Sequence, residues 1–404
     1  LIFISWDNNM HKNTKHLLTV VGLATTLAFS AQHASAALNK DTDTMNTPDY
    51  SEWDVLNPPY ARETVNIETD ELTWASLDIS PDDKTIVFDT LGDIFTVSAD
   101  GGTATPLTQD YAWNIQPQFS PDGQHIAFIS DRDGLSNVWV MKADGTELRQ
   151  VTDENNNLIH APRWTSDGQY IMVTKGIMSS RSIPAGEIWM YHISGGDGLQ
   201  IQKRKNGKKD QKNISDPAFS PDGKYIYFTQ DVTSGFRFSY NRDPLKGTFA
   251  ITRMDRETGE TERFVSGVGG AVVPTPSPDG KHLAFVRRIR EKTALFVKDL
   301  ETGLEEPIFT GLERDMQEGF GTEGYFSYFD WTSDSQHIVF WTGGKLHKLN
   351  VADQSLQTLD IALKTEVQHA KAARSSYDVA PDTFDIKMIR WAQKSPDGKK
   401  ALFQ

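Results

Sequence analysis

The chain has 404 residues, of which 38% are hydrophobic and 24% are charged, and it contains ten tryptophans. This composition is typical of a globular protein with an aromatic core and excludes a disordered chain. The formal net charge of −14 at pH 7 disfavours nucleic acids and anionic membrane surfaces as partners. Cysteine is absent, which excludes disulfides, thiolate zinc sites and lipid attachment through a cysteine.

The first 36 residues have the pattern of a secretory leader preceded by a short upstream stretch. Met10 is followed by basic residues, by an apolar run over 17–29, and by the sequence Ala-Ser-Ala at 34–36 that is typical of a cleavage site. The apolar run is too short to span a bilayer comfortably. We therefore expect residues 1–36 to comprise upstream residues and a signal peptide, and the mature protein to be periplasmic or secreted, with no membrane span.

Residues 37–62 follow as an N-terminal extension ahead of the repeats. The sequence ETVNIETDE at 63–71 then alternates between polar and apolar residues, which indicates a strand. A propeller commonly closes by pairing an N-terminal strand with its last blade. We therefore expect this strand to pair with the last repeat.

The rest of the chain repeats one ten-residue phrase seven times. Each copy holds a turn of the Ser-Pro-Asp-Gly type followed by alternating hydrophobic residues, as in FSPDGKYIYF at 219–228. Proline fixes the first corner of such a turn, aspartate can accept hydrogen bonds from nearby N–H groups, and glycine tolerates positive φ. The turn aspartates, which we predict to be structural, are Asp82, Asp122, Asp167, Asp222, Asp279, Asp334 and Asp397.

The residues four and six positions after each turn aspartate are hydrophobic, and this period of two is typical of a strand buried on one face. A second hairpin follows in each unit, as in NVWVMKADGTELRQVT at 137–152. Four strands in about 40 to 60 residues are the pattern of a β-propeller blade. The sequence therefore predicts an all-β fold, a β-propeller of four-stranded blades over 63–390. Six repeats are complete, and residues 391–404 begin a further, truncated blade.

Four repeats carry a proline five residues before the turn aspartate. Proline within a sheet is confined largely to its edges. We therefore predict that the strand entering the turn is the innermost strand of its blade, next to the central channel. The four prolines are Pro117, Pro162, Pro217 and Pro274.

The Ser-Pro-Asp-Gly hairpins resemble those of the TolB-like propeller family. Longer segments resemble the N-terminal propeller region of large secreted bacterial amidohydrolases, among them DRETGETE at 255–262, RDMQEGF at 314–320 and APDTFDIKMIRWAQKSPDGK at 380–399. In that family a metal-dependent hydrolase barrel follows the propeller. The resemblance implies that the chain is a fragment whose partner is a downstream hydrolase domain of the same chain. It also implies that a divalent metal such as zinc belongs to that domain.

The sequence itself shows no catalytic constellation. None of the ten histidines forms a His-x-His pair, and neither an H-E-x-x-H helix motif nor a G-x-S-x-G nucleophile elbow occurs. We therefore expect no catalytic residue, metal ligand or cofactor within these 404 residues.

Residues that lead into the channel-side strands are candidates for ligand binding. Loops at the mouth of a propeller place aromatic and polar groups around a concavity, which is a usual place for a ligand. Packing between blades is the simpler interpretation of each one. The candidates are Trp113, Asn114, His160, Arg163, Tyr325, Tyr328, Arg390 and Trp391.

Three functions stay open. The first is a non-catalytic propeller of a secreted amidohydrolase, which binds a small-molecule or peptide substrate, binds a partner, or gates access to the hydrolase domain. The second is a stand-alone TolB-like module that docks an envelope protein, and the third is the propeller of a serine peptidase. The basic run KRKNGKKDQK at 203–212 either binds an anionic ligand or forms a solvated loop.

Overall fold

The computed structural model describes residues 54–180, 184–238, 243–313, 326–371, 378–383, 388 and 390–402. The chain divides into two units, residues 1–48 and residues 49–404, and every described residue belongs to the second. The predicted signal peptide and its start at Met10 therefore lie outside the described residues. Within the described ranges, no helix is long and apolar enough to cross a membrane.

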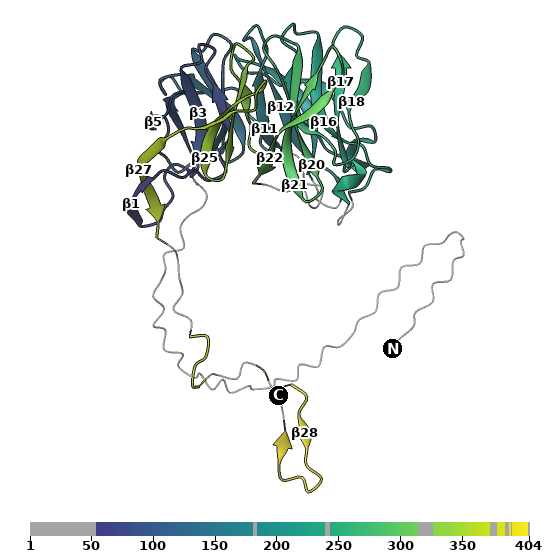
Figure 1. The fold of residues 1–404 in the computed structure, drawn as a ribbon. Coiled ribbons are helices and arrows are strands. Elements are labelled where there is room, and N and C mark those ends of the chain that lie inside the picture. The colour runs from purple at the N-terminus through teal and green to yellow at the C-terminus, as the bar shows by residue number, and fades with distance from the viewer. Residues whose placement is uncertain are drawn as a thin grey trace, which may run out of the picture. The chain divides into compact units, whose positions relative to one another are not determined.

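Six antiparallel sheets of four strands each follow one another along the chain (Figure 1). Blade 1 consists of β2 (Leu77–Ile79), β3 (Thr85–Thr90), β4 (Asp93–Ser98) and β6 (Thr105–Pro106). Blade 2 consists of β7 (Asn114–Phe119), β8 (His125–Ser130), β9 (Asn137–Lys142) and β10 (Arg149–Gln150). Blade 3 consists of β11 (Leu158–Trp164), β12 (Tyr170–Met178), β13 (Pro184–His192) and β14 (Leu199–Gln202).

The second half of the ring repeats this arrangement. Blade 4 consists of β15 (Ile214–Phe219), β16 (Tyr225–Asp231), β17 (Phe249–Asp255) and β18 (Thr261–Val265). Blade 5 consists of β19 (Val272–Pro276), β20 (His282–Ile289), β21 (Lys292–Asp299) and β22 (Glu305–Leu312). Blade 6 consists of β23 (Asp330–Trp331), β24 (His337–Thr342), β25 (Lys345–Asn350) and β26 (Leu356–Thr358). Among the described residues, the connecting loops hold the short 3-10 helices η3 (Gly207–Lys209) and η4 (Pro244–Lys246). The predicted fold class, an all-β propeller of four-stranded blades, is confirmed.

A three-stranded sheet lies outside the six blades. β1 (Arg62–Thr69) pairs antiparallel with β27 (Ile361–Ala370), and β27 pairs parallel with β5 (Gly102–Thr103) of the first repeat. The N-terminal strand therefore pairs with the segment that follows blade 6 and does not join the sheet of that blade. The seventh copy of the turn lies between β28 (Gln393–Lys394) and β29 (Ala401–Leu402), which form a separate hairpin.

The first and last blades are held together by hydrophobic packing. One cluster of buried side chains combines Leu77 and Phe88 of blade 1 with Val339 and Leu346 of blade 6, and it extends to Ile361 at the start of β27. Burial of apolar surface of this kind is the main favourable term in folding. The ring of six blades is therefore closed without the seventh repeat.

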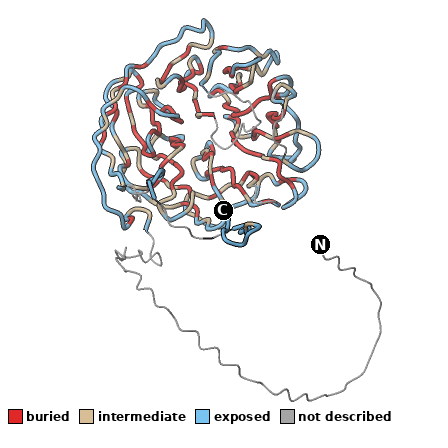
Figure 2. Tube along the Cα trace, turned by 90° about the horizontal axis from the view of Figure 1, so that it is seen from below, coloured by how far each residue is buried: buried red, intermediate tan, exposed pale blue. Residues whose placement is uncertain are grey.

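The first strands form the inner wall of the ring. β23, β2, β7, β11, β15 and β19 neighbour one another in that order, and each is an edge strand of its own sheet. Figure 2 shows the blades arranged around a common centre, with buried positions along the strands and exposed positions in the outer loops. Proline is tolerated in these inner strands because an edge strand leaves some N–H groups unpaired.

The repeated hydrophobic positions form the cores between blades. In each of the six complete repeats, the residues four and six positions after the turn aspartate are at most 2% exposed. In blade 4 these residues are Ile226 and Phe228, and they pack against Met172 and Ile188 of blade 3. The period of two read from the sequence thus marks the face that each second strand turns toward its neighbours.

The packing role of the phrase at 219–228 can be measured with a matched pair of variants. Phe228→Ala should lower the free energy of unfolding by about 3–5 kcal/mol, because it removes a buried ring and leaves a cavity between blades. Lys224→Ala, on the same strand connection but exposed, should change it by no more than about 0.5 kcal/mol. Urea titration of both variants tests this, and equal losses would contradict the inter-blade position of Phe228.

Candidate functional site

The turns between the first and second strands of the six blades converge on one pocket of about 370 Å³. Because this pocket touches all six turns, the turns lie at the same end of the propeller. Its rim is formed by the residue before each turn aspartate: Pro81, Pro121, Ser166, Pro221, Pro278 and Ser333. Its wall is formed by the residues two positions earlier: Ile79, Phe119, Trp164, Phe219, Pro276 and Trp331. We call this pocket the funnel.

The floor of the funnel is formed by the residue just before each wall residue, four positions before the turn aspartate. Successive Cβ atoms of a strand alternate between its two faces, so one position per blade can turn toward the axis. Unlike the rim, this position differs in chemistry from blade to blade. Its six residues are Asp78, Gln118, Arg163, Ala218, Thr275 and Asp330.

Two carboxyl groups dominate the electrostatics of the floor. Asp78 on β2 and Asp330 on β23 line the floor from neighbouring strands, and each carboxyl group acts on the pKa of the other. Burial, followed by the charge of Asp330, raises the pKa of Asp78 well above its ordinary range. Burial also raises the pKa of Asp330, while the nearby Arg163 guanidinium lowers it. Protonation of Asp78 is therefore favoured over ionisation of both carboxyl groups.

A packed polar layer closes the channel below the floor. It is formed by the residues six positions before each turn aspartate, all of them buried: Ser76, Gln116, Ala161, Asp216, Val273 and Tyr328. The Tyr328 hydroxyl of blade 6 donates a hydrogen bond of 2.8 Å to Asp216 Oδ1 of blade 4. The Arg163 guanidinium of blade 3 lies 4.5 Å from the centre of the Tyr328 ring. Side chains from three blades thus meet on the axis, and the funnel ends on them.

His160 lies beside this layer on β11. Its Nε2 is buried and has no hydrogen-bond partner among the described residues. Burial lowers the pKa of His160 to about 4, although the neighbouring Asp216 carboxyl acts in the opposite direction. The imidazole is therefore neutral near pH 7. Of the eight predicted binding residues, the structure brings His160, Arg163 and Tyr328 together on the axis.

Trp113 and Asn114 lie in the segment that enters β7 from blade 1. Trp113 is 58% exposed and its ring covers Gly92, while Asn114 is fully buried. The Asn114 amide donates to the carbonyl oxygens of Gly92 and Ala112, and its oxygen accepts a hydrogen bond from Arg132. Neither residue lines the funnel. Asn114 instead fastens the first two blades to each other.

The remaining predicted binding residues are not brought to the axis by the described structure. Tyr325 lies outside the described residues. Arg390 and Trp391 are exposed and precede β28. Across the described ranges, neither of these two forms a hydrogen bond or ion pair with the other predicted binding residues; Arg390 Nε contacts the Met388 sulfur at 3.3 Å.

The seven turn aspartates bind their own turns. In each, a carboxylate oxygen accepts a hydrogen bond of 2.5–2.7 Å from the Ser or Thr hydroxyl two residues earlier. The same oxygen accepts the backbone N–H two residues later. The hydroxyl donor is the main reason why the pKa of Asp122 is lowered. These contacts explain why an aspartate recurs in every repeat, and the explanation needs no catalytic role.

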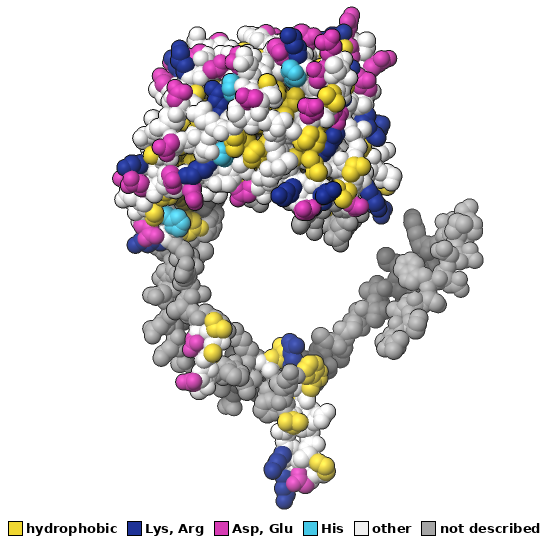
Figure 3. Space-filling model, in the orientation of Figure 1, with side chains coloured by type: hydrophobic (Ala, Val, Ile, Leu, Met, Phe, Trp, Pro, Cys, Tyr) yellow, Lys and Arg dark blue, Asp and Glu magenta, His cyan; other side chains and the backbone are white. Residues whose placement is uncertain are grey.

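The basic run at 203–212 is an anchored loop between blades 3 and 4. Arg204 is 4% exposed and donates from Nε to Glu187 Oε1 at 3.0 Å, while Lys212 pairs with Asp231 at 3.4 Å. On the face of the molecule in Figure 3, acidic and basic side chains are intermingled and do not form one basic patch. The two buried basic residues of the run therefore stabilise the loop.

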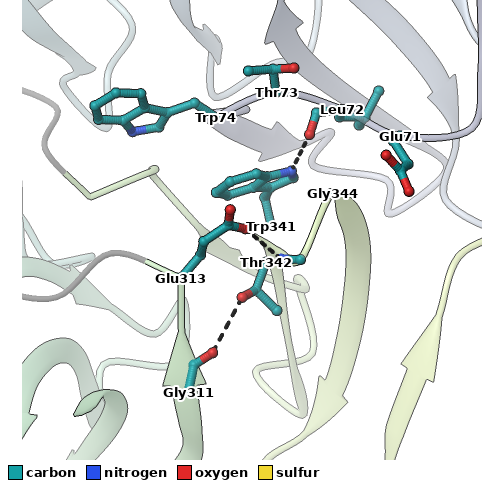
Figure 4. A pocket seen from close by; sticks show the side chains of 10 residues that line it. Glu71, Leu72, Thr73, Trp74, Gly311, Glu313, Trp341, Thr342 and Gly344 are labelled. Carbon is teal, nitrogen blue, oxygen red and sulfur yellow. Dashed lines mark hydrogen bonds between the residues drawn. The ribbon is translucent and has the colours of Figure 1, made fainter. Parts of the chain in front are cut away.

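A second pocket, of about 560 Å³, lies between the segment before β2 and the ends of β22 and β24 (Figure 4). Its polar groups are engaged with one another. Trp341 Nε1 donates to the Leu72 carbonyl oxygen at 3.0 Å, and the Gly343 N–H donates to Glu313 Oε2 at 2.9 Å. The funnel is the stronger candidate for a ligand site, because its floor carries two carboxyl groups and the Thr275 hydroxyl, which has no hydrogen-bond partner among the described residues.

The sequence-based choice of site residues missed most of the funnel floor. Asp78, Thr275 and Asp330 were not among the predicted residues, because the candidates were chosen as aromatic and polar residues leading into the inner strands, without a comparison of one fixed position across the repeats. A signal was present in the repeat itself. The position four residues before the turn aspartate is the one that changes between acidic, basic, amide and hydroxyl side chains from copy to copy.

The contact that closes the channel can be tested by removing one hydroxyl. Tyr328→Phe should lower the free energy of unfolding by about 1–3 kcal/mol, because the buried Asp216 carboxyl loses a donor. The difference in unfolding free energy between Tyr328→Phe and the wild type should become smaller as the pH falls, because a protonated Asp216 carboxyl no longer needs that donor. Tyr170→Phe, at a partly exposed tyrosine whose hydroxyl has no hydrogen bond among the described residues, is the control and should stay within about 0.5 kcal/mol. Equal effects of the two variants in urea titrations would contradict the cross-channel contact.

Comparison with known proteins gives the type of propeller. Residues 77–207 match the family model described as the Tricorn protease N-terminal beta propeller domain. The chain is 30% identical over 158 residues to the uncharacterized peptidase YuxL of Bacillus subtilis (strain 168), a match that covers 33% of this chain and 24% of that protein. It is 28% identical over 198 residues to the Tol-Pal system protein TolB of Wolinella succinogenes, covering 46% of this chain and 44% of that protein.

A solved structure of the tricorn protease aligns with a TM-score of 0.52 at 14% identity, covering 72% of this chain and 26% of that chain. The chain spans less than half the length of the curated relatives it matches. It therefore carries a β-propeller of the type found in TolB and in the N-terminal domain of Tricorn protease.

Proposed function

We propose that this chain is the non-catalytic propeller of a larger periplasmic or secreted amidohydrolase, and that its funnel receives part of a substrate or partner. The observation that carries the proposal is the funnel itself. It has the size of a ligand pocket, an apolar wall, and a few polar groups that converge at its floor. The resemblance of 255–262 and 380–399 to the propeller region of amidohydrolases supports the choice of parent enzyme.

The hydrolase chemistry would lie in the downstream domain of the same chain. Within the described ranges, no group of three or more His, Cys, Asp or Glu side chains could hold a metal ion. A divalent metal such as zinc, held by that domain, would supply Lewis-acid activation of the attacking water. The propeller would contribute binding and control of access, with the closed channel preventing passage along the axis.

A second candidate is the propeller of a serine peptidase. The match of residues 77–207 to the Tricorn propeller and the similarity to a protein named as a peptidase favour it. The funnel would then receive part of a peptide substrate. The two candidates differ in the chemistry of the domain that follows the propeller.

The proposal is tested by assaying residues 37–404 and the product of the whole gene side by side on N-acylated amino acids and dipeptides. Residues 37–404 should show no turnover above a heat-treated control, whereas the whole product should hydrolyse amides and lose activity with a metal chelator. Metal-dependent turnover by residues 37–404 would overturn the non-catalytic role. Inhibition of the whole product by a serine-directed phosphonate, and not by the chelator, would favour the second candidate. No hydrolysis by either would favour a stand-alone module of the TolB type.

A further inference from the structure

The funnel floor gathers hydrogen-bond acceptors that lack enough donors. Asp78 Oδ2 accepts the backbone N–H of Phe119 at 2.6 Å, and its carboxyl group faces that of Asp330. Within the described ranges, no lysine, arginine or histidine nitrogen lies within 4.0 Å of either carboxyl group as an ion pair. Two adjacent acids in one pocket repel each other when both are ionised. Among the described residues, neither carboxyl group therefore has an ion-pair partner.

A buried hydroxyl in the same pocket also lacks a partner. Thr275 is 6% exposed and lines the funnel, and its Oγ1 has no hydrogen-bond partner among the described residues. Burying a hydroxyl without a hydrogen bond costs free energy, so buried polar groups are nearly always paired. This orphaned oxygen is independent of the carboxyl pair, and it leaves the floor with a buried acceptor for which no described residue supplies a donor.

Arg163 is the one cation of the floor, and it contacts Gln118 and Tyr328. Its Nη1 donates to Gln118 Oε1, and its guanidinium lies over the ring of Tyr328. It lowers the pKa of the acidic pair by its charge alone. The remaining charged group that acts on the pair is Asp83, which raises the pKa of Asp330. An anionic ligand would therefore meet two carboxyl groups with little compensation.

The wall of the funnel suits an apolar stem. Trp164 and Trp331 are fixed by hydrogen bonds from their indole nitrogens to the carbonyl oxygens of Gln118 and Thr275, at 3.1 and 2.9 Å. Their rings and the four rim prolines present apolar surface, and aromatic faces attract cations. A ligand that joins an apolar chain to a positive, hydrogen-donating end matches both the wall and the floor.

We propose that the funnel floor binds a primary ammonium group, such as a lysine side chain or the amino terminus of a peptide. An ammonium group has three donors and no acceptor, which suits a floor where three side chains, Asp78, Asp330 and Thr275, carry acceptor oxygens. A calcium ion is a poorer match, because it takes six to eight oxygen ligands. The inference rests on the proposed role of the funnel as a ligand site, although binding and hydrolysis are measured by separate assays.

Binding should be coupled to the release of a proton. Because burial and the second carboxyl group raise the pKa of Asp78, we expect the unliganded pair to hold one proton, and an incoming ammonium group favours ionisation of both. That proton then passes to solvent as the ammonium group takes its place between the oxygens. The affinity should therefore rise with pH while the amine itself remains charged.

The test uses the 404-residue chain and titration calorimetry with three probes of equal chain length. Pentylammonium carries charge and donors, pentyltrimethylammonium carries charge alone, and 1-pentanol carries neither. We expect pentylammonium to bind at least tenfold more tightly than the other two. Its binding heat should also depend on the buffer in the way that release of up to one proton requires. Equal affinity for all three probes would overturn the proposal.

Two variants locate the site. Asp330→Asn should lower the affinity for pentylammonium at least tenfold and change the proton release, and Thr275→Val, nearly isosteric, should lower the affinity about threefold to tenfold. Asp100→Asn, which removes an exposed acidic group from blade 1, is the matched control and should leave both quantities unchanged. Wild-type binding by Asp330→Asn and Thr275→Val would overturn the assignment.

The source of the ammonium group is distinguished by two further ligands. Nα-acetyl-lysine amide offers only the side-chain ammonium group, and trialanine amide offers only the amino terminus. Tighter binding of the first identifies a lysine-type ligand, and tighter binding of the second identifies a peptide amino terminus. Failure of both to bind would contradict the proposal, whereas failure of the hydrolysis assay alone would leave the ammonium site standing.

Discussion

The propeller depends on one backbone feature, a bulge in the inner strand of each of blades 2 to 5. At this bulge a non-glycine residue adopts a positive φ of 50–58°: Gln116, Ala161, Asp216 and Val273. Such a conformation costs about 1–3 kcal/mol for a non-glycine residue and persists only where the surroundings hold it. What holds it is a hydrogen bond from the N–H of that residue to a side chain of the preceding blade.

The acceptors differ, but the bond recurs around the ring. Asp89 accepts the N–H of Gln116 at 2.6 Å, and the side chain of Gln116 in turn accepts the N–H of Ala161 at 2.8 Å. Thr174 and Thr229 accept the corresponding N–H groups of the next two blades, both at 3.1 Å. In blades 2 to 5 the bulge also sets the register of the inner strand, and the residue four positions before the turn lines the funnel there as it does in blades 1 and 6. Hydrophobic packing between blades holds them together. The residue four positions before the turn aspartate is not needed for that packing, so its chemistry can differ from repeat to repeat.

The blades could be predicted from the sequence because the patterns that mark them are local. Turns of the Ser-Pro-Asp-Gly type and a buried period of two, as in Ile226 and Phe228, need only a few neighbouring residues to be recognised. The axial layers were not predictable in this way. A residue before proline normally favours extended backbone, so the positive φ of Asp216 before Pro217 runs against the local preference. The hydrogen bond between Tyr328 and Asp216 joins residues 112 positions apart, and no local pattern records it.

The central claim is that the bulge amides lock each of blades 2 to 5 to the blade before it. Hydrogen–deuterium exchange of individual amides, followed by NMR at neutral pH, tests it most directly. The account predicts that the amides of Gln116, Ala161, Asp216 and Val273 exchange as slowly as the amides of the buried second strands, through opening of the whole ring. Exchange of these four amides at the rate of exposed turn amides would contradict it.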